Sequence, residues 1–357
     1  MRKNPDLLLI LMVVVLYIFG ILWQFSASSV DFLKYGEFTS FKRYLIHVAI
    51  SISALILFII VPLKTIKKFA KPLFIISLLL LVLVYIPGLS LRSDYRRWII
   101  IGSFSFQPSE LFKLALIIYS SYVLSSEYFI WKKWRYLFPL ILYSGIGILL
   151  IVFEKDLSTG ALTYLILLSM LYIGTWNKKH FLVPLSVSLL FPVMVKLNRS
   201  WWERIIYTLQ PFKYNTDKSY QIAQSLIAIG SGGIFGRGYM MGKQKFDYIP
   251  YVSKDFIFSL ICEESGFIGG LIIIILILGI LIRGYRVSVK AKDPFIKFLS
   301  FGITTHIVLQ SFVVIGVNIG LLPVTGLPFP FLSYGGTALL INGIEMGLLI
   351  NTSRGIS

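Results

Sequence analysis

The chain has 357 residues, of which 57% are hydrophobic and only 14% are charged, and its mean hydropathy is +0.82. A soluble domain carries about 25% charged residues, and no aqueous fold could bury this much apolar surface. The formal net charge of +18 would suggest nucleic acid in a soluble protein, but no basic stripe lies on a soluble module. Composition therefore predicts an integral membrane protein and excludes nucleic-acid binding.

A membrane-spanning helix needs about 20 mostly apolar residues. Ten such runs predict an all-α polytopic membrane protein with a single domain over residues 1–357. The runs lie near residues 7–27, 44–63, 72–89, 109–126, 136–153, 157–174, 181–195, 256–282, 298–322 and 337–352. The first run is longer than the core of a signal peptide, so we interpret it as a retained helix. An even number of spans places both ends of the chain on one side.

Basic residues gather in the cytoplasmic loops of membrane proteins. With both termini in the cytoplasm, the inner connections carry many more Lys and Arg residues than the short outer ones, notably within 64–71, 132–135 and 283–292. We therefore expect a protein of the cytoplasmic (inner) membrane with both termini cytoplasmic. Residues 196–255 then form a long extracytoplasmic loop between spans seven and eight.

Loops of that length are usually functional or disordered. Ile222, Leu226 and Ile229 repeat at helical spacing, which predicts a short amphipathic helix lying along the membrane surface. The glycines from Gly230 onward should end it. The single cysteine, Cys262, lies in an apolar run, so we expect a buried hydrophobic side chain rather than a disulfide or metal ligand.

The first polar cluster opens the fourth span. Pro108 and Ser109 are typical of a helix start, with Ser109 as the cap. Glu110 and Lys113 are three residues apart and share one helix face. Ionised groups at membrane depth normally pair or line a wet cavity. The pair is therefore either a structural ion pair or a cavity wall, and the sequence leaves both open.

Two further acidic clusters are predicted on the outer side. Asp156, in the turn before the sixth span, either caps that helix or faces the same cavity as Glu110. Asp255 lies where water meets hydrocarbon, and a low dielectric raises the pKa of a carboxyl group. That favours a general base, although a helix cap is the alternative. Glu263 and Glu264 follow about two turns deeper, and at least one should face protein or water. Both are therefore candidate cavity residues.

Residues 326–336 combine prolines with glycines and include Ser333 and Tyr334. Irregular backbone at membrane depth is tolerated only around a protein-lined cavity, so we interpret this stretch as a re-entrant or cavity-edge segment. Asn318 and Asn342 flank it and are expected to satisfy its backbone groups.

Four of these motifs together resemble the SEDS (FtsW/RodA) family of shape, elongation, division and sporulation proteins. The resemblance covers about Arg96 to Arg354, and the motifs occur in the family's order. They lie at residues 104–110, 220–233, 255–264 and 322–336. The resemblance implies a peptidoglycan glycosyltransferase that acts outside the cytoplasmic membrane. Such an enzyme polymerises lipid II, a disaccharide-peptide on undecaprenyl pyrophosphate.

By this resemblance Asp255 corresponds to the family's essential aspartate, and Glu110, Lys113 and Asp156 to its polar cavity residues. The chain departs from the family pattern at Lys155, Ser158 and Gly160, at Ser253-Lys254 and at Phe112. Residues 244–250 are more similar to the division branch of the family than to the elongation branch. A class B penicillin-binding transpeptidase and other division proteins are the implied partners.

The mechanism that we expect is a single displacement that inverts the anomeric centre. Asp255 removes the proton from the sugar 4-hydroxyl of an incoming lipid II, while pyrophosphate leaves the lipid-linked glycan. The leaving group needs positive charge, for which the candidates are Arg96, Arg97, Lys113, Arg204 and Arg237. A divalent cation such as Mg²⁺ or Mn²⁺ held by carboxylates could assist, but the sequence shows no dedicated site.

Two other classes of function fit parts of the same pattern. Ten spans, buried charge and a broken helical segment also suit a transporter that flips lipid II. A structural scaffold of a division complex is the third alternative, and it would tolerate loss of Asp255 and Glu110.

Overall fold

The computed structural model describes residues 4–86, 97–101, 104–126, 134–174, 199–214, 216–246, 248–249 and 252–354, with positions 182, 185, 186, 188 and 196. Long helices in this part of the chain are α1 (Leu7–Ala27), α3 (Thr39–Ile60), α4 (Leu63–Leu83), α5 (Pro108–Leu124), α7 (Trp134–Phe153), α8 (Leu157–Gly174), α13 (Ile257–Lys290), α14 (Pro294–Asn318) and α15 (Gly336–Ser353). The shorter elements are α2 (Ser29–Tyr35), α11 (Arg199–Leu209), α12 (Asp217–Gly232) and an antiparallel hairpin of β1 (Ile99–Ile101) and β2 (Phe104–Phe106).

The all-helical architecture expected from composition is confirmed. Each long helix overlaps one of the expected spans. The seventh expected span, residues 181–195, lies mostly outside the described residues. The count of ten spans therefore stays a prediction. By length and composition alone, five of the described helical segments could cross a membrane.

Several helix starts follow local chemistry. The Asp6 carboxylate accepts hydrogen bonds from the amides of Leu8 and Leu9 and so caps α1. Pro108 stands in the first turn of α5, where its missing N–H costs nothing. The prediction that Ser109 caps this helix is wrong: the cap position is Gln107, and the buried Ser109 hydroxyl has no hydrogen-bond partner among the described residues.

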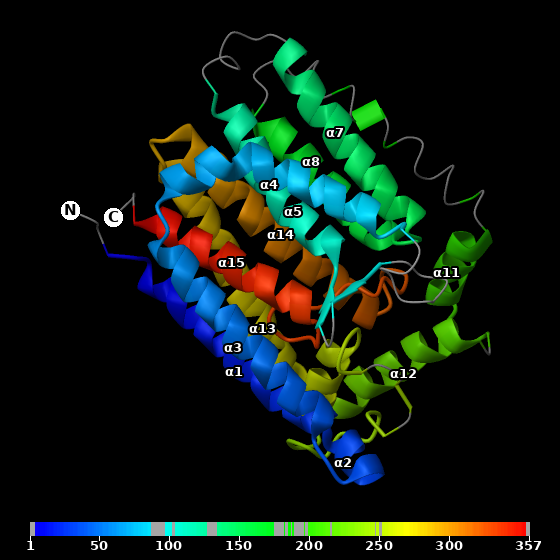
Figure 1. Cartoon of the computed structure of the whole chain (residues 1–357). Coiled ribbons are helices and arrows are strands. Elements are labelled where there is room, and N and C mark those ends of the chain that lie inside the picture. Colours follow the sequence, from blue (N-terminus) through cyan, green and yellow to red (C-terminus); the bar gives the residue numbers. More distant parts are fainter. Residues whose placement is uncertain are drawn as a thin grey trace.

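The helix α14 lies at the centre of the bundle and packs against α13, α5, α8 and α15 (Figure 1). Most of its side chains are buried. In α3, by contrast, only Tyr44, Val48 and Ser51 are buried. A helix surrounded by protein rather than lipid can carry polar groups on several faces, because those groups can find partners there. The polar side chains discussed below therefore gather on α14 and on its neighbours.

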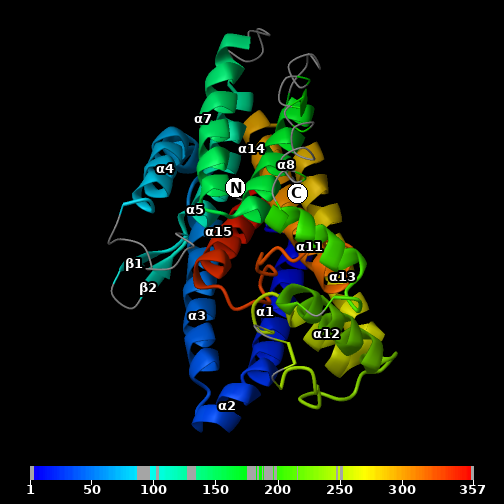
Figure 2. The same ribbon diagram turned by 90° about the vertical axis from the view of Figure 1, so that its right-hand side faces the viewer.

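The two ends of the chain lie side by side at one end of the bundle, as an even number of spans predicts (Figure 1). There the Asp6 amide donates to the Ser353 hydroxyl over 3.0 Å. The helices α2, α11 and α12 lie at the opposite end. Figure 2 shows α11 and α12 running across the long helices.

The helix predicted in the long loop is confirmed as α12, which ends at Gly232, but its surroundings differ from the expectation. The apolar face packs against α13, and Ile222 is buried. Leu226 and Ile222 also lie beside Gly320, at the end of α14. This apolar face is therefore covered at least partly by protein rather than by the membrane surface.

Candidate functional site

Asp255 lies in the turn that leads into α13, and its side chain is partly exposed. Residues 326–335, which we call the strap, run beside this turn without regular secondary structure. The Ser333 hydroxyl donates to the Lys254 carbonyl, and the Tyr334 amide donates to the Ser253 carbonyl over 2.8 Å. Two consecutive strap residues thus hold the two residues that precede Asp255.

Buried side chains of α1 and α3 anchor the strap in turn. The Gln24 amide donates to the carbonyls of Ser253 and Leu332 over 2.7 and 2.8 Å, so it binds the turn and the strap together. The Tyr44 hydroxyl donates to the Phe331 carbonyl over 2.9 Å. Phe331 has a φ of 67°, a conformation that costs a non-glycine residue about 1–3 kcal/mol. These contacts therefore hold the strap in a defined, locally strained shape.

The expectation for the two flanking asparagines is not met. The Asn318 amide donates to the Asp255 carbonyl over 3.0 Å, and its Oδ1 accepts from the Ser259 amide over 3.1 Å. Asn318 thereby caps the first turn of α13 from a different helix, which leaves the Asp255 carboxylate out of that role. Asn342 Oδ1 is buried without a hydrogen-bond partner among the described residues. Sequence spacing alone could not show these contacts, nor that of Gln24, because they join distant segments.

The electrostatic surroundings of Asp255 suit a base. Burial raises the pKa of its carboxyl group to about 6, and the positive charge of Lys254 limits the rise. No hydrogen bond to its carboxylate oxygens is present within the described part of the chain. The group is therefore ionised at neutral pH and has its lone pairs available for a proton.

Glu110 and Lys113 form the ion pair expected from their spacing, with 3.0 Å between Oε1 and Nζ. Both side chains are fully enclosed, and Lys113 also donates to Gln310 Oε1 over 2.8 Å. The start of α5 is tied to the start of α15, because the Thr337 hydroxyl accepts from the Gln107 amide over 3.1 Å. The pair lies behind the strap, since the Gln310 amide group also donates to the carbonyl of strap residue Pro328.

Asp156 caps α8, as one of the two alternatives expected, and it also lies beside Arg97. Its Oδ1 accepts from the Thr159 amide over 3.2 Å and caps α8, while Oδ2 lies 3.6 Å from an Arg97 nitrogen. Arg97 also donates to the carbonyls of Glu154 and Lys155. Burial and the neighbouring Asp156 raise the pKa of Glu154 to about 9. Glu154 therefore holds a proton at neutral pH, which the sequence did not indicate.

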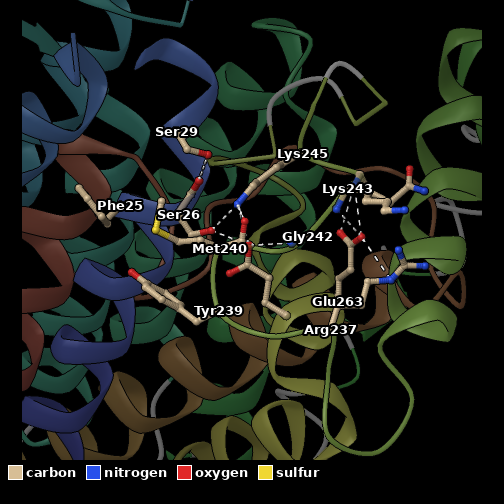
Figure 3. A network of polar contacts seen from close by, with 12 residues as sticks. Phe25, Ser26, Ser29, Arg237, Tyr239, Met240, Gly242, Lys243, Lys245 and Glu263 are labelled. Atoms are coloured by element: carbon tan, nitrogen blue, oxygen red, sulfur yellow. Dashed lines mark hydrogen bonds and ion pairs between the residues drawn. The ribbon is translucent and has the colours of Figure 1, made fainter. Parts of the chain in front are cut away.

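Glu263 and Glu264 hold the loop onto α13, in a cluster shown in Figure 3. Glu263 accepts hydrogen bonds from the amides of Lys243 and Gln244, the shortest over 2.7 Å. Glu264 Oε1 lies 2.9 Å from Lys245 Nζ and accepts from a serine of α1, Ser26. We call this group of side chains the clasp. Both glutamates face protein, as expected, and the loop binds both oxygens of Glu263 and the Oε1 atom of Glu264.

The clasp coincides with a break in α13. Gly266 has φ 68° and ψ −165°, which interrupts the helix and frees backbone groups on both sides. The loop satisfies them: the amides of Arg237 and Gly238 donate to the carbonyls of Glu263 and Glu264 over 3.0 Å each. In the other direction, α13 amides after the break donate to carbonyls of the loop. Backbone hydrogen bonds thus fix the long loop to α13 at this point.

The remaining candidates are dispersed. Arg204 donates from α11 to the Val324 carbonyl over 3.2 Å, and Arg237 lies 3.9 Å from Glu263. Arg96 lies outside the described residues. The described residues contain no group of three His, Cys, Asp or Glu side chains that could hold a metal ion, and Cys262 is buried with a free thiol. The site therefore centres on Asp255, the strap and the ion pair behind it.

Comparison with known proteins gives consistent matches. A family model for FtsW, RodA and SpoVE, described as cell cycle protein, matches residues 6–356. Stage V sporulation protein E of Bacillus subtilis is 36% identical over 358 residues, covering 99% of this chain and 98% of its own. A probable peptidoglycan glycosyltransferase FtsW of Geobacter metallireducens is 36% identical over 356 residues, covering 98% and 95%.

Solved structures agree in fold. A chain of a peptidoglycan synthase complex, solved to explain the coordination of polymerization and crosslinking, superposes with a TM-score of 0.80 at 25% identity and covers 98% of both chains. The rod shape determining protein RodA of Thermus thermophilus gives a TM-score of 0.71 at 24% identity, covering 99% of this chain and 97% of its own. The second likeness shows the fold alone: a multi-span helical membrane protein.

Proposed function

The chain belongs to the SEDS family of FtsW, RodA and SpoVE, and from this premise we propose that it is a peptidoglycan glycosyltransferase that polymerises lipid II. The proposal rests on the match to FtsW and SpoVE proteins over the whole chain. Asp255, which is partly exposed and has a pKa raised by burial, supports it as the candidate base. A scaffold would have no use for such a carboxylate, whereas a sugar hydroxyl needs a base before it can attack.

In the proposed reaction, the Asp255 carboxylate takes the proton from the 4-hydroxyl of the acceptor sugar of lipid II. The electron pair of that oxygen forms a bond to the anomeric carbon of the lipid-linked glycan. The bond between this carbon and the phosphate oxygen breaks, and its electrons leave with undecaprenyl pyrophosphate. The proton on Asp255 then passes to solvent. One displacement of this kind inverts the anomeric centre and requires no covalent sugar–enzyme intermediate.

The leaving pyrophosphate needs cationic groups on the outer side of the membrane. We propose Arg97, Arg204 and Arg237, with Arg96, as these groups. Lys113 is enclosed beside Glu110, so it acts through the position of its neighbours rather than by touching the phosphates. The described residues do not assemble a metal site, and no step is assigned to a metal ion.

We propose further that the chain works in septal wall synthesis, with both termini in the cytoplasm and ten spans. The similarity to FtsW proteins supports the division role, and the basic residues near the joined ends of the chain support the orientation. The similarity to a chain from a synthase complex supports a class B penicillin-binding transpeptidase as partner. Elongation is the alternative role within the family.

The decisive experiment supplies lipid II to the purified protein in detergent, with and without that partner and over a series of divalent ions. Detergent removes the two sides of the membrane, so a flippase has nothing to do there, and only a polymerase lengthens glycan chains. We expect glycan products that depend on the protein. Failure to form any product under all of these conditions, by a protein that flips lipid II in vesicles, would contradict the proposal.

A further inference from the structure

A row of enclosed polar side chains crosses the centre of the bundle from α5 through α14 to α15. It begins with Glu110 and Lys113 and continues to Gln310 over 2.8 Å. Gln310 Oε1 lies 2.9 Å from His306 Nε2, and His306 Nδ1 lies 2.8 Å from both oxygens of Glu345. All five side chains are at most 1% exposed. Only Glu110 and Lys113 belong to the motifs discussed above.

The Gln310 amide has only one acceptable orientation. Its nitrogen donates to the Pro328 carbonyl over 2.7 Å, while its oxygen faces two nitrogen atoms, Lys113 Nζ and His306 Nε2. If the amide turned over, its NH₂ group would face the lysine ammonium, and its oxygen would face a carbonyl oxygen. Both contacts would be repulsive, since neither would join a donor to an acceptor. The orientation is therefore set by its neighbours.

This orientation also determines the protonation of the histidine. An amide oxygen can only accept, so His306 Nε2 must carry a hydrogen atom. His306 Nδ1 then faces the Glu345 carboxyl group across a short contact that needs one proton. Whether the proton resides on Nδ1 or on the carboxyl group, the two side chains together have no net charge. Neutrality matters here, because an uncompensated charge in the membrane interior is costly.

On its other side, Gln310 connects to the turn that carries Asp255. Pro328 belongs to the strap, whose residues Ser333 and Tyr334 bond to the carbonyls of Lys254 and Ser253. A single amide group therefore fixes two things: the place of the lysine beside Glu110, and one end of the strap that holds the base. No other described side chain bonds to both.

We propose that Gln310 is a positioning residue for glycosyl transfer, and that the proton shared by His306 and Glu345 keeps its amide in the required orientation. The proposal rests on the proposed function. Loss of this amide releases the strap from α14, and the base shifts relative to the acceptor hydroxyl. Geometric shifts of about 1 Å by remote mutations cost about 100-fold in rate.

The test compares Gln310→Leu with Thr304→Val in the lipid II polymerisation assay with the transpeptidase partner. Thr304 is an equally buried residue of α14, and within the described part of the chain its hydroxyl bonds only to the carbonyl of Ser300 in its own helix. We expect Gln310→Leu to lower kcat about 100-fold with an unchanged KM, and Thr304→Val to leave both unchanged. A Gln310→Leu variant as fast as wild type would overturn the proposal.

A second pair of variants separates orientation from mere packing. In Glu345→Gln the new amide can donate to Nδ1 of a neutral His306, which keeps the hydrogen on Nε2, so activity should be retained. Glu345→Leu cannot do this and should lose activity as Gln310→Leu does. Equal losses in both Glu345 variants would contradict the orienting role.

Nitrogen-15 NMR of histidine-labelled wild-type protein tests the arrangement even if the Leu variants fail to fold. We expect one histidine with a hydrogen on Nε2 and a Nδ1 signal that shifts in Glu345→Gln. A His306 that carries hydrogen on Nδ1 alone would overturn the proposal. A wild-type protein without polymerase activity would instead overturn the proposed function, and the NMR result would still decide the arrangement of the side chains.

Discussion

Asp255 and the two glutamates of the clasp, all predicted for the outer side, have opposite surroundings. In the clasp, Glu263 accepts from loop amides, and Glu264 is bound by Lys245 and Ser26. At the strap, the backbone around Asp255 is held from several sides, while its carboxylate has no hydrogen bond in the described part of the chain. The contrast teaches that a carboxylate bound by amides or by a lysine holds structure, and that one without hydrogen bonds can accept a proton.

The largest effect is expected at Asp255. Asp255→Asn preserves shape but removes the base, and general base catalysis contributes about 10²–10⁴-fold. Polymerisation of lipid II by the purified variant should fall by that factor, while its elution from a sizing column should match wild type. Glu203→Gln, at a partly exposed acid of α11 in the same loop, is the matched control and should leave the rate unchanged. Equal activity of Asp255→Asn and wild type would show that Asp255 is not the base.

In the clasp, the expected effect is on stability. Lys245→Met leaves the enclosed Glu264 without its cation, and breaking a buried pair in this way costs about 3–5 kcal/mol. Denaturant unfolding in detergent should show this loss. Lys243→Met is the control, because its side chain is exposed and only its backbone amide contacts Glu263. If both variants were as stable as wild type, the clasp would not hold the loop.

A smaller loss of stability is expected at Asn318, which both caps α13 and bonds to the Asp255 carbonyl. Asn318→Ala removes the cap of α13 and the contact to the Asp255 carbonyl, and loss of a cap costs about 1 kcal/mol. Unfolding should report that loss, and the polymerisation rate should fall by more than the loss of folded protein explains. A rate that falls only in proportion to the folded fraction would show that Asn318 does not position the base.

The smallest change concerns the charge beside the base. Lys254 favours the ionised form of Asp255, so Lys254→Met should raise the pKa of that carboxyl group further. The acid limb of the pH–rate profile should then move to higher pH. A limb that stays in place or moves to lower pH would show that Lys254 does not act on Asp255.

The sequence could predict the helical fold, most helix boundaries and the two ion-pairing groups, Glu110 with Lys113, because these depend on local spacing. It could also predict that Asp255 stands at the boundary of a span. It could not predict that Gln24, Asn318 and Gln310 bond to distant carbonyls, since no local pattern encodes a contact between segments.

The break at Gly266 was missed for a related reason. A glycine in an apolar run predicts nothing by itself, and the carbonyls and amides that stabilise the break come from the loop near residues 233–238. For the same reason Glu263 and Glu264 were assigned to the cavity: only the fold shows that loop amides and Lys245 bind them.

The pH dependence of wild-type polymerisation tests the central claim most directly. A base must be deprotonated to act, so kcat/KM should fall as the pH drops through about 6, the raised pKa of Asp255. Below that value the rate should decrease about tenfold per pH unit. A profile that stays flat down to the ordinary pKa of an aspartate, 3.8, would contradict the assignment of Asp255 as the base.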